Sequence, residues 1–299
     1  MAAVRPAAAE LVTLPAPRLV GVADFWKRFS KNKAGVFGAA AAALLVAIAL
    51  AAPWLAPYPS NLQDYDAIMQ PPSWAHWFGT DELGRDVLSR VIFGTRVSLK
   101  AGFFSVAIAV AVGLPVGLVS GYYRGVWDEM VLMRVVDALQ AFPFLILALA
   151  MVAALGPGLG NAIIAIGIGF VPSVIRVVRA QVMQVREQEF IAAARAVGAS
   201  DLRILFVHAI PNCLGPVLVQ ASLAVAAAII AEAGLSYLGL GVQPPDPSWG
   251  SSLRFAQGYL QTAPWMAYWP GAAIFVAVLA FNLLGDGLRD ALDPRLRGE

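Results

Sequence analysis

The chain has 299 residues, of which 59% are apolar and only 13% are charged. A typical soluble domain has about 45–50% apolar and about 25% charged residues, so this composition excludes a disordered chain and predicts a protein that crosses a membrane several times. The net charge of +2 is too small for a nucleic-acid-binding surface. The single cysteine, Cys213, cannot form a disulfide within the chain.

Long uncharged stretches predict the membrane-spanning helices, because a charge at the centre of a bilayer costs about 2.5–3.5 kcal/mol. The uncharged stretch at 138–175 is too long for a single helix of about 20 residues. The turn-forming sequence at 156–161, Gly-Pro-Gly-Leu-Gly-Asn, divides it into two helices. The prediction is an all-α polytopic membrane protein with six transmembrane helices, at 35–57, 98–121, 135–155, 161–182, 213–233 and 266–285.

Lysine and arginine residues predict the orientation, because the cytoplasmic segments of membrane proteins carry an excess of them. With the N-terminus in the cytoplasm, sixteen of the 21 Lys and Arg residues lie on the cytoplasmic side and five lie outside. We therefore expect a multi-pass protein of the cell membrane with both termini in the cytoplasm.

The same boundaries divide the chain into segments. Residues 1–34 form a cytoplasmic tail, 35–57 the first transmembrane helix, and 58–97 a long outer loop. A five-helix core follows at 98–286 and includes a cytoplasmic loop at 183–212, before a second cytoplasmic tail at 287–299.

One face of the second predicted helix carries small residues. Gly113, Gly117 and Gly121 are four positions apart, and this spacing lets the backbone of a neighbouring helix approach closely. Helix packing is the role that the spacing predicts.

No motif of a catalytic site occurs in the sequence. The histidines His76 and His208 lack a second metal ligand at a suitable spacing, and no lysine follows the glycine pattern of a phosphate-binding loop. We therefore expect no catalytic residue, no metal site and no cofactor bound by this chain. Asp137, Glu232 and Asp286 lie near the ends of predicted helices, which disfavours an ion-coupled secondary transporter. That transporter and an intramembrane enzyme stay open as alternatives.

The cytoplasmic segment 187–212 is the most informative part of the sequence. It opens with an Ala-rich run that favours a helix, and Gly198 suits the position just after a helix end. Ser200 suits the cap of a second helix that has Asp201 in its first turn. Pro211 marks the start of the fifth span. The residues alone predict two short helices at the membrane face, which either dock a partner or form an ordinary interfacial loop.

This segment resembles the coupling motif of ABC-importer permeases. The motif has the form Glu-Ala-Ala, three residues, Gly, about nine residues and Ile-x-Leu-Pro. Gly198 and Pro211 match it, while Ala192 stands in the place of the glutamate and His208 in the place of the isoleucine. Neither departure disturbs the order of helix, glycine and helix.

Two longer stretches narrow the family. Residues 78–90 resemble the outer-loop signature of peptide-type permeases, and residues 232–250 resemble their segment after the fifth span. The resemblance covers about residues 25–295. The chain is similar to the C-type membrane subunit of ABC-importer permeases of the dipeptide/oligopeptide/nickel family.

The resemblance implies a type I ABC importer permease fold in the inner membrane and a non-catalytic subunit that forms half of a pathway for peptides. It implies a homologous second permease, two ATP-binding subunits that hold ATP and Mg, an extracytoplasmic solute-binding protein, membrane lipid around the spans and no nucleic-acid partner. Nickel chelates and glutathione are the alternative substrates. The residues expected to couple to the ATPase are Glu189, Phe190, Ala192, Ala193, Ala194, Arg195, Gly198, Ala199, Ser200, Asp201 and Pro211.

Two further sets of residues are predicted with alternatives left open. A helix beginning near Thr80 is expected to lie on the outer membrane surface, where it either receives the binding protein or only packs on the spans. Polar residues on the spans either face a water-filled pathway or form interhelical hydrogen bonds. The docking candidates are Asp81, Glu82, Arg85, Asp86 and Trp249, and the pathway candidates are Gln140, Ser173, Gln220, Ser222 and Asn282.

Overall fold

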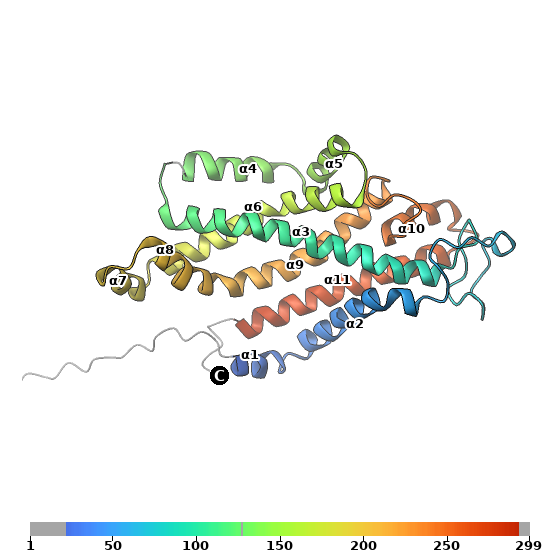
Figure 1. The fold of residues 1–299 in the computed structure, drawn as a ribbon, viewed down its shortest axis with the longest axis horizontal. Coiled ribbons are helices and arrows are strands. Elements are labelled where there is room, and N and C mark those ends of the chain that lie inside the picture. The colour runs from blue at the N-terminus through green and yellow to red at the C-terminus, as the bar shows by residue number, and fades with distance from the viewer. Residues whose placement is uncertain (1–21, 127, 293–299) are drawn as a thin grey trace, which may run out of the picture.

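The computed structural model of the chain describes residues 22–126 and 128–292. These residues form helices and connecting segments, with no β-strand among them, so the predicted all-α membrane fold is confirmed (Figure 1). The long helices are α2 (Lys33–Leu55), α3 (Val87–Tyr123), α6 (Leu159–Arg186), α9 (Ile210–Tyr237) and α11 (Trp265–Leu292). The shorter helices are α1 (Val22–Phe29), α4 (Met133–Ala141), α5 (Phe144–Leu155), α7 (Glu189–Ala196), α8 (Asp201–Arg203) and α10 (Trp249–Ala256). Four 3₁₀ or π-helical stretches complete the set: η1 (Tyr65–Ala67), η2 (Asp128–Leu132), η3 (Ile204–Ala209) and η4 (Gln257–Tyr259).

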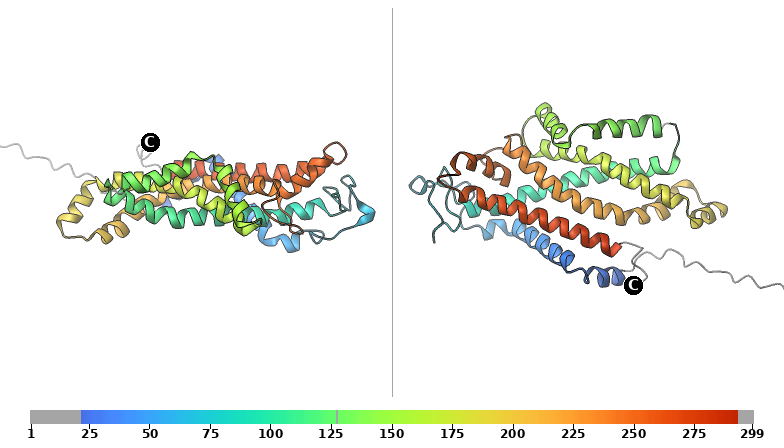
Figure 2. Two further views of the ribbon diagram at one scale, coloured as in Figure 1. Left: turned by 90° about the horizontal axis from the view of Figure 1, so that it is seen from above. Right: turned by 180° about the vertical axis from the view of Figure 1, so that it is seen from behind.

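The long helices lie side by side and carry the chain from one end of an elongated molecule to the other (Figures 1 and 2). One end, which we call the α7 end, holds α1, α7, α8 and the last residues of α11. The opposite end, which we call the α10 end, holds α10 and the segment 56–86. α9 packs against α3, α6 and α11 and so occupies the interior of the bundle.

Five continuous helices in the described part of the chain are long and apolar enough to cross a membrane, when α8, η3 and α9 are taken as one. The helical segments Asp128–Ala141 and Phe144–Leu155 meet at an angle of 92°, and the count reaches the predicted six when this bent pair is taken as one broken span. The single helix predicted at 135–155 is therefore wrong. Pro143 explains the break, since it holds Phe142 in extended backbone (φ −82°, ψ 135°) and cannot continue the hydrogen bonding of α4.

The longest uncharged stretch divides where the sequence predicted. α5 ends at Leu155 and α6 begins at Leu159. Gly156 and Gly158, which lie between the two helices, have φ values of +93° and +141° that other residues rarely adopt. Asn161 closes the turn by donating its side-chain amide to the carbonyl groups of Leu155 (3.0 Å) and Gly156 (2.9 Å).

Helices extend further than the charge pattern predicted. α1 lies inside the expected tail 1–34, and α11 continues to Leu292, inside the expected tail 287–299. The remainder of those tails, residues 1–21 and 293–299, lies outside the described residues. The outer loop ends at Asp86 instead of residue 97, because α3 begins at Val87. A charged residue limits the part of a helix that lies in lipid, but it does not end the helix.

Glycines bring α3 close to α6. A Cβ atom added to Gly117 would lie 2.7 Å from the Cβ atom of Val178 and 2.9 Å from the carbonyl oxygen of Ile175. Gly113 and Gly121 approach α6 equally closely, at 2.7 and 2.8 Å. The packing role that the four-residue glycine spacing predicted is therefore confirmed.

α2 and α11 form a second closely packed pair. A Cβ atom added to Gly35 would lie 2.7 Å from the Cα atom of Gly287. Asn32 caps α2 by accepting the backbone N–H of Gly35 (2.8 Å), and its side-chain amide donates to the carboxylate of Asp290 (2.6 Å). The first and last spans are thereby joined at the α7 end.

Gly117→Ala should destabilise the chain, because the added methyl group would push α3 away from α6. Overpacking of this kind costs about 1–3 kcal/mol, so we expect a lower melting temperature in detergent. Gly271→Ala in α11 is the matched control, because nothing lies within 4 Å of its added methyl group. Thermal unfolding followed by size-exclusion chromatography measures both variants, and equal melting temperatures would contradict the packing role of Gly117.

Candidate functional site

Residues 187–212, the segment with the coupling motif, connect α6 to α9 at the α7 end (Figure 1). α7 ends in a Schellman cap, in which the N–H of Gly198 donates to the carbonyl of Arg195 (2.9 Å) and the N–H of Ala199 donates to the carbonyl of Ala194 (3.0 Å). This cap needs a left-handed residue, and Gly198 has a φ of +83°. The prediction that Gly198 ends the first short helix is confirmed.

The second short helix begins as predicted but does not end before the fifth span. Ser200 is its N-cap, and the serine hydroxyl accepts the N–H of Arg203 at 3.4 Å. From Asp201 the helix continues through the π-helical stretch Ile204–Ala209 into α9. The expected separation of this helix from a span that starts at Pro211 is therefore wrong. The π-helical turns before Pro211 accommodate the missing N–H of proline, so the helix stays continuous.

The loop has a buried face and an exposed face. Ile191 and Ile204 are buried in the apolar core of the α7 end. Val197 is 85% exposed, and Leu202 and Phe206 are each 65% exposed. Large exposed apolar side chains occur at contacts with other proteins when they lie together on a surface. Of the predicted coupling residues, Glu189, Ala192, Ala193, Arg195, Gly198, Ser200 and Asp201 are exposed, and Phe190, Ala194, Ala199 and Pro211 are partly buried.

The exposed apolar residues are missing from the predicted coupling set. The sequence does contain a signal for them, because Val197 and Leu202 are large apolar residues that stand among charged residues such as Arg195 and Arg203. A solvated loop would carry polar residues at such positions.

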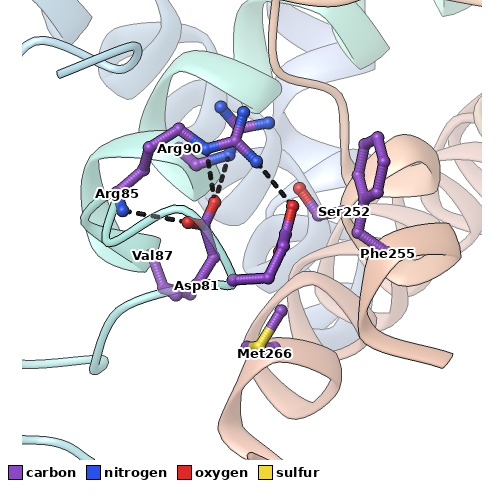
Figure 3. Close-up of a pocket in the computed structure, with 8 residues that line it drawn as sticks. Asp81, Arg85, Val87, Arg90, Ser252, Phe255 and Met266 are labelled. Atoms are coloured by element: carbon purple, nitrogen blue, oxygen red, sulfur yellow. Dashed lines mark hydrogen bonds and ion pairs between the residues drawn. The ribbon is translucent and has the colours of Figure 1, made fainter. Parts of the chain in front are cut away.

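A cluster of charged side chains lies at the α10 end of the bundle (Figure 3). The Oδ2 atom of Asp81 is 2.6 Å from Nε of Arg85 and 3.5 Å from Nε of Arg90. The Oδ1 atom of Asp81 accepts the backbone N–H groups of Leu83 and Arg85, both at 2.9 Å. Nη2 of Arg85 also donates to Glu82 at 2.9 Å. Burial, and then the charge of Asp81, raise the pKa of Glu82 above its ordinary value.

Asp86 joins this cluster to α3. Its Oδ2 atom accepts the backbone N–H of Ser89 at 2.8 Å and the serine hydroxyl at 2.7 Å, so Asp86 is the N-cap of α3. Its Oδ1 atom lies 3.0 Å from Nδ1 of His76. The prediction of a helix that begins near Thr80 is wrong. The carboxylate of Asp81 accepts N–H groups within a tight turn, and the helix, α3, is capped by Asp86 instead.

Most of the docking candidates are buried within the chain. The exposed fraction is 5% or less for Asp81, Arg85, Asp86 and Trp249, and Glu82 is partly buried. The indole of Trp249 donates to the carbonyl of Val91 in α3 at 3.0 Å. The expectation that these side chains directly meet a binding protein does not agree with this burial. Their paired charges and hydrogen bonds instead hold the segment before α3 in shape.

Glu232 of α9 is fully buried, and its hydrogen bonds join α9 to α3. Its carboxyl group accepts the hydroxyl of Ser98 at 3.1 Å and the hydroxyl of Ser236 at 2.6 Å. The Ser236 hydroxyl in turn accepts the backbone N–H of Val242 at 3.1 Å. Glu232 thus ties two spans and the segment after α9 together near the α10 end.

Gln220, one of the pathway candidates, lines a cavity. The cavity has a volume of about 320 Å³ and lies between α6, α9 and α11, where Gln181 and Arg289 also line it. Three polar residues therefore line the same space.

The other pathway candidates have different surroundings. Ser222 is buried and donates its hydroxyl to the carbonyl of Val219 at 2.8 Å, within its own helix. A Cβ atom added to Gly285 of α11 would lie 2.8 Å from the Ser222 hydroxyl, so this serine is in a helix contact. Ser173 and Asn282 are partly buried. Gln140 is exposed on α4.

Two family descriptions match the sequence. "Binding-protein-dependent transport system inner membrane component" matches residues 113–298, which is more than half of the chain. The chain belongs to this family of permeases. "N-terminal TM domain of oligopeptide transport permease C" matches residues 22–72 of the permease. The resemblance to a C-type permease that the motifs predicted is therefore confirmed.

The permease is similar over nearly its whole length to proteins named "Glutathione transport system permease protein GsiD". It is 45% identical to the one from Pectobacterium atrosepticum over 294 residues, which are 97% of both chains. It is 46% identical to the one from Escherichia coli O6:K15:H31 over 276 residues, which are 92% of this chain and 91% of the relative. The corresponding protein of Shigella boydii is 47% identical over the same extent.

Solved structures agree with the family in fold. The permease resembles a chain of the methionine ABC transporter MetNI in an inward-facing conformation, with a TM-score of 0.58 and 21% identity. The likeness covers 69% of the permease and 97% of the MetNI chain. A second crystal form of MetNI gives a TM-score of 0.56 at 20% identity. The fold is that of an ABC-importer permease, as predicted.

Asp81→Ala should destabilise the α10 end, because it leaves two buried arginines with fewer partners. Removing one partner of a buried ion pair costs about 3–5 kcal/mol, and we expect the lower end of this range because Glu82 still pairs with Arg85. Asp66→Ala is the matched control, since Asp66 is exposed in the same segment and such changes cost about 0.5 kcal/mol or less. Thermal unfolding and limited proteolysis of the segment 56–86 measure the difference. If both variants behave alike, the cluster does not stabilise this end.

Proposed function

We propose that this permease forms one half of the translocation pathway of an ATP-driven importer for short peptides, with glutathione as the first candidate. The observation that carries the proposal is its 45–47% identity to permeases named for glutathione transport. Glutathione is itself a tripeptide, so it belongs to the peptide class that the motifs implied. The match to an oligopeptide permease domain supports the same class. Nickel chelates are therefore the less favoured alternative.

In this proposal the energy comes from other subunits. Two ATPase subunits bind ATP and Mg, a homologous second permease completes the pathway, and a solute-binding protein delivers the solute from outside. The coupling loop, residues 187–212, meets the ATPase. The exposed apolar side chains of Val197, Leu202 and Phe206 support this contact, and the cap at Gly198 supports a rigid loop that can transmit movement.

We place the α7 end in the cytoplasm, with both termini. The excess of lysine and arginine in the segments assigned to that side, sixteen of 21, supports this orientation. An ATPase can reach the coupling loop only if the loop is cytoplasmic, so the docking experiment described below also tests the orientation.

The cavity between α6, α9 and α11 supports a pathway for a peptide-like solute. Gln181, Gln220 and Arg289 line it. An arginine can pair with a carboxylate through two parallel hydrogen bonds, and glutathione has two carboxylates. We propose that these three residues form part of the pathway wall.

The binding protein is proposed to dock on the segment before α3. Trp74 is 95% exposed and Trp77 is 63% exposed, and both line an open cavity of about 460 Å³ with Pro72 and Ser73. Exposed tryptophans are common at the centre of protein contacts. In this proposal Asp81, Glu82, Arg85, Asp86 and Trp249 hold the docking surface in shape and do not contact the partner themselves.

Uptake by the reconstituted transporter tests the proposed function. We expect proteoliposomes that contain both permeases and the ATPase, supplied with the binding protein, to accumulate labelled glutathione at least tenfold over vesicles without ATP. Unlabelled dipeptides and tripeptides should compete more strongly than a nickel–histidine chelate. Omission of the binding protein is the control, and it should abolish uptake. Uptake by the permease alone in a proton or sodium gradient would contradict the proposal.

Gly198→Val should abolish coupling while the permease still reaches the membrane. A valine in left-handed backbone costs about 1–2 kcal/mol, which tilts α7 but does not prevent insertion of the apolar spans. No neighbouring atom lies within 4 Å of an added Cβ atom, so the effect comes from backbone strain alone. We expect normal membrane abundance, weakened co-purification of the ATPase and loss of uptake.

Gly160→Val is the matched control for this substitution. It places the same side chain in open space, but in the first turn of α6, where helical backbone accepts it. Membrane abundance, ATPase co-purification and uptake are measured for both variants. Wild-type docking and uptake by Gly198→Val would overturn the coupling role of residues 187–212.

A further inference from the structure

Tyr122 lies in the last turn of α3, at the α7 end, and only 5% of its surface is exposed. Its carbonyl oxygen accepts Nη1 of Arg186 at 2.6 Å, which ties the end of α3 to the end of α6. The guanidinium group of Arg186 also lies 6.0 Å from the centre of the tyrosine ring. The other polar contacts of the Tyr122 side chain are made with the coupling loop.

Both short helices of the loop contact the Tyr122 side chain. The tyrosine hydroxyl donates to Oδ1 of Asp201, the first residue of α8, at 2.6 Å. The guanidinium group of Arg195, in the last turn of α7, lies 5.5 Å from the centre of the tyrosine ring. A short hydrogen bond to a carboxylate and a cation above a ring are directional contacts, so they fix the loop in orientation as well as in position.

The contact at Tyr122 joins the coupling loop to a helix that is not its neighbour in the sequence. The coupling loop is continuous with α6 at one end and with α9 at the other, whereas α3 is distant from it in sequence. Among the side-chain hydrogen bonds of the described residues, the Tyr122–Asp201 bond is the one that joins residues 187–203 to a helix not continuous with them. Apolar packing of Ile191 and Ile204 in the same core accompanies this bond but has no fixed direction.

We propose that Tyr122 is the positioning residue through which movement of the coupling loop reaches α3. The inference rests on the proposed coupling role of residues 187–212. When the ATPase moves the loop, α6 and α9 follow because the chain is continuous, and α3 is carried along by its close packing on α6. Tyr122 adds a direct connection from the end of α3 to Asp201 and Arg195. Without that connection, α3 would follow the loop only through α6, and ATP hydrolysis would be less efficiently converted into transport.

Tyr122→Phe tests the link, because it removes the hydroxyl and keeps the ring. In the reconstituted transporter we expect normal membrane abundance and ATPase docking, but at least a threefold decrease in the number of solute molecules carried per ATP hydrolysed. The probe is labelled glutathione, or labelled trialanine if the unmodified transporter carries that instead. A purely structural role would lower the amount of transporter and leave this ratio unchanged.

Tyr123→Phe is the matched control. It makes the same substitution at the next residue, whose side chain is 54% exposed, and it should leave the ratio at the wild-type value. Asp201→Asn changes the other partner of the bond at an exposed position and keeps an oxygen that can accept the hydroxyl. We expect it to lower the ratio less than Tyr122→Phe does, and we expect the double variant to be no worse than Tyr122→Phe alone.

A distance measurement tests the same link without any solute. Spin labels at Gln188→Cys in the loop and Val119→Cys in α3, with the buried Cys213→Ala, report whether loop and helix move together. We expect one narrow distance that is the same without nucleotide and with trapped ATP, and a broadened or shifted distance when Tyr122→Phe is added. This readout applies even if Tyr122→Phe is poorly active.

The outcomes separate this inference from the proposed function. If Gly198→Val keeps ATPase docking and uptake, the coupling role of the loop fails and the inference fails with it. If Gly198→Val loses docking while Tyr122→Phe keeps the wild-type transport ratio and spin-label distance, the coupling role stands and the Tyr122 link is wrong.

Discussion

The close approach of α3 to α6 positions most of the features described above. Lipid tails are as apolar as leucine, so two helices in a membrane gain little by hiding apolar side chains from lipid and are held by close packing instead. Three glycines on one face of α3 allow that packing, and at Gly117 a single added carbon would lie 2.7 Å from α6. At the C-terminal end of α3, Tyr122 bonds to Asp201 of the coupling loop. At its N-terminal end, Asp86 caps the helix and joins it to the segment that precedes it.

Features that depend on a few neighbouring residues could be predicted from the sequence. The break between α5 and α6 follows from the glycines at 156–160, the end of α7 from Gly198, and the start of α8 from Ser200. In each case the backbone conformation is decided by one residue type at one position. The break at Pro143 is equally local, but a proline inside an apolar run leaves the spacing of the charged residues unchanged, and the spans were predicted from that spacing.

Features that depend on distant contacts could not be predicted. Thr80, Asp81 and Asp86 are all suitable helix caps, and the choice of Asp86 depends on Ser89 and on His76, which approaches from another part of the loop.

The charged residues around Asp81 were expected on the outer surface, because charged residues are usually exposed. Their burial requires α10 and α11, which follow far later in the chain and supply Phe255 and Met266 to the same cluster. The motif likewise drew attention to residues 187–212 but did not indicate which of their apolar side chains are exposed, because exposure is decided by how this segment folds back on the bundle.

The two longest helical segments of the permease are fastened to each other at both ends. α3 and the segment Asp201–Tyr237 each have 37 residues, so each is a rod of about 55 Å, well beyond the hydrocarbon thickness of about 30 Å. The Tyr122–Asp201 bond connects the rods at the α7 end, and the Ser98–Glu232 bond connects them near the α10 end. Rods pinned at two points cannot slide along one another, and they can only tilt as a pair. For rods of this length, a tilt of about 10° about one tip carries the other tip through roughly 10 Å, so a small change in angle at one end of the pair corresponds to a large displacement at the other.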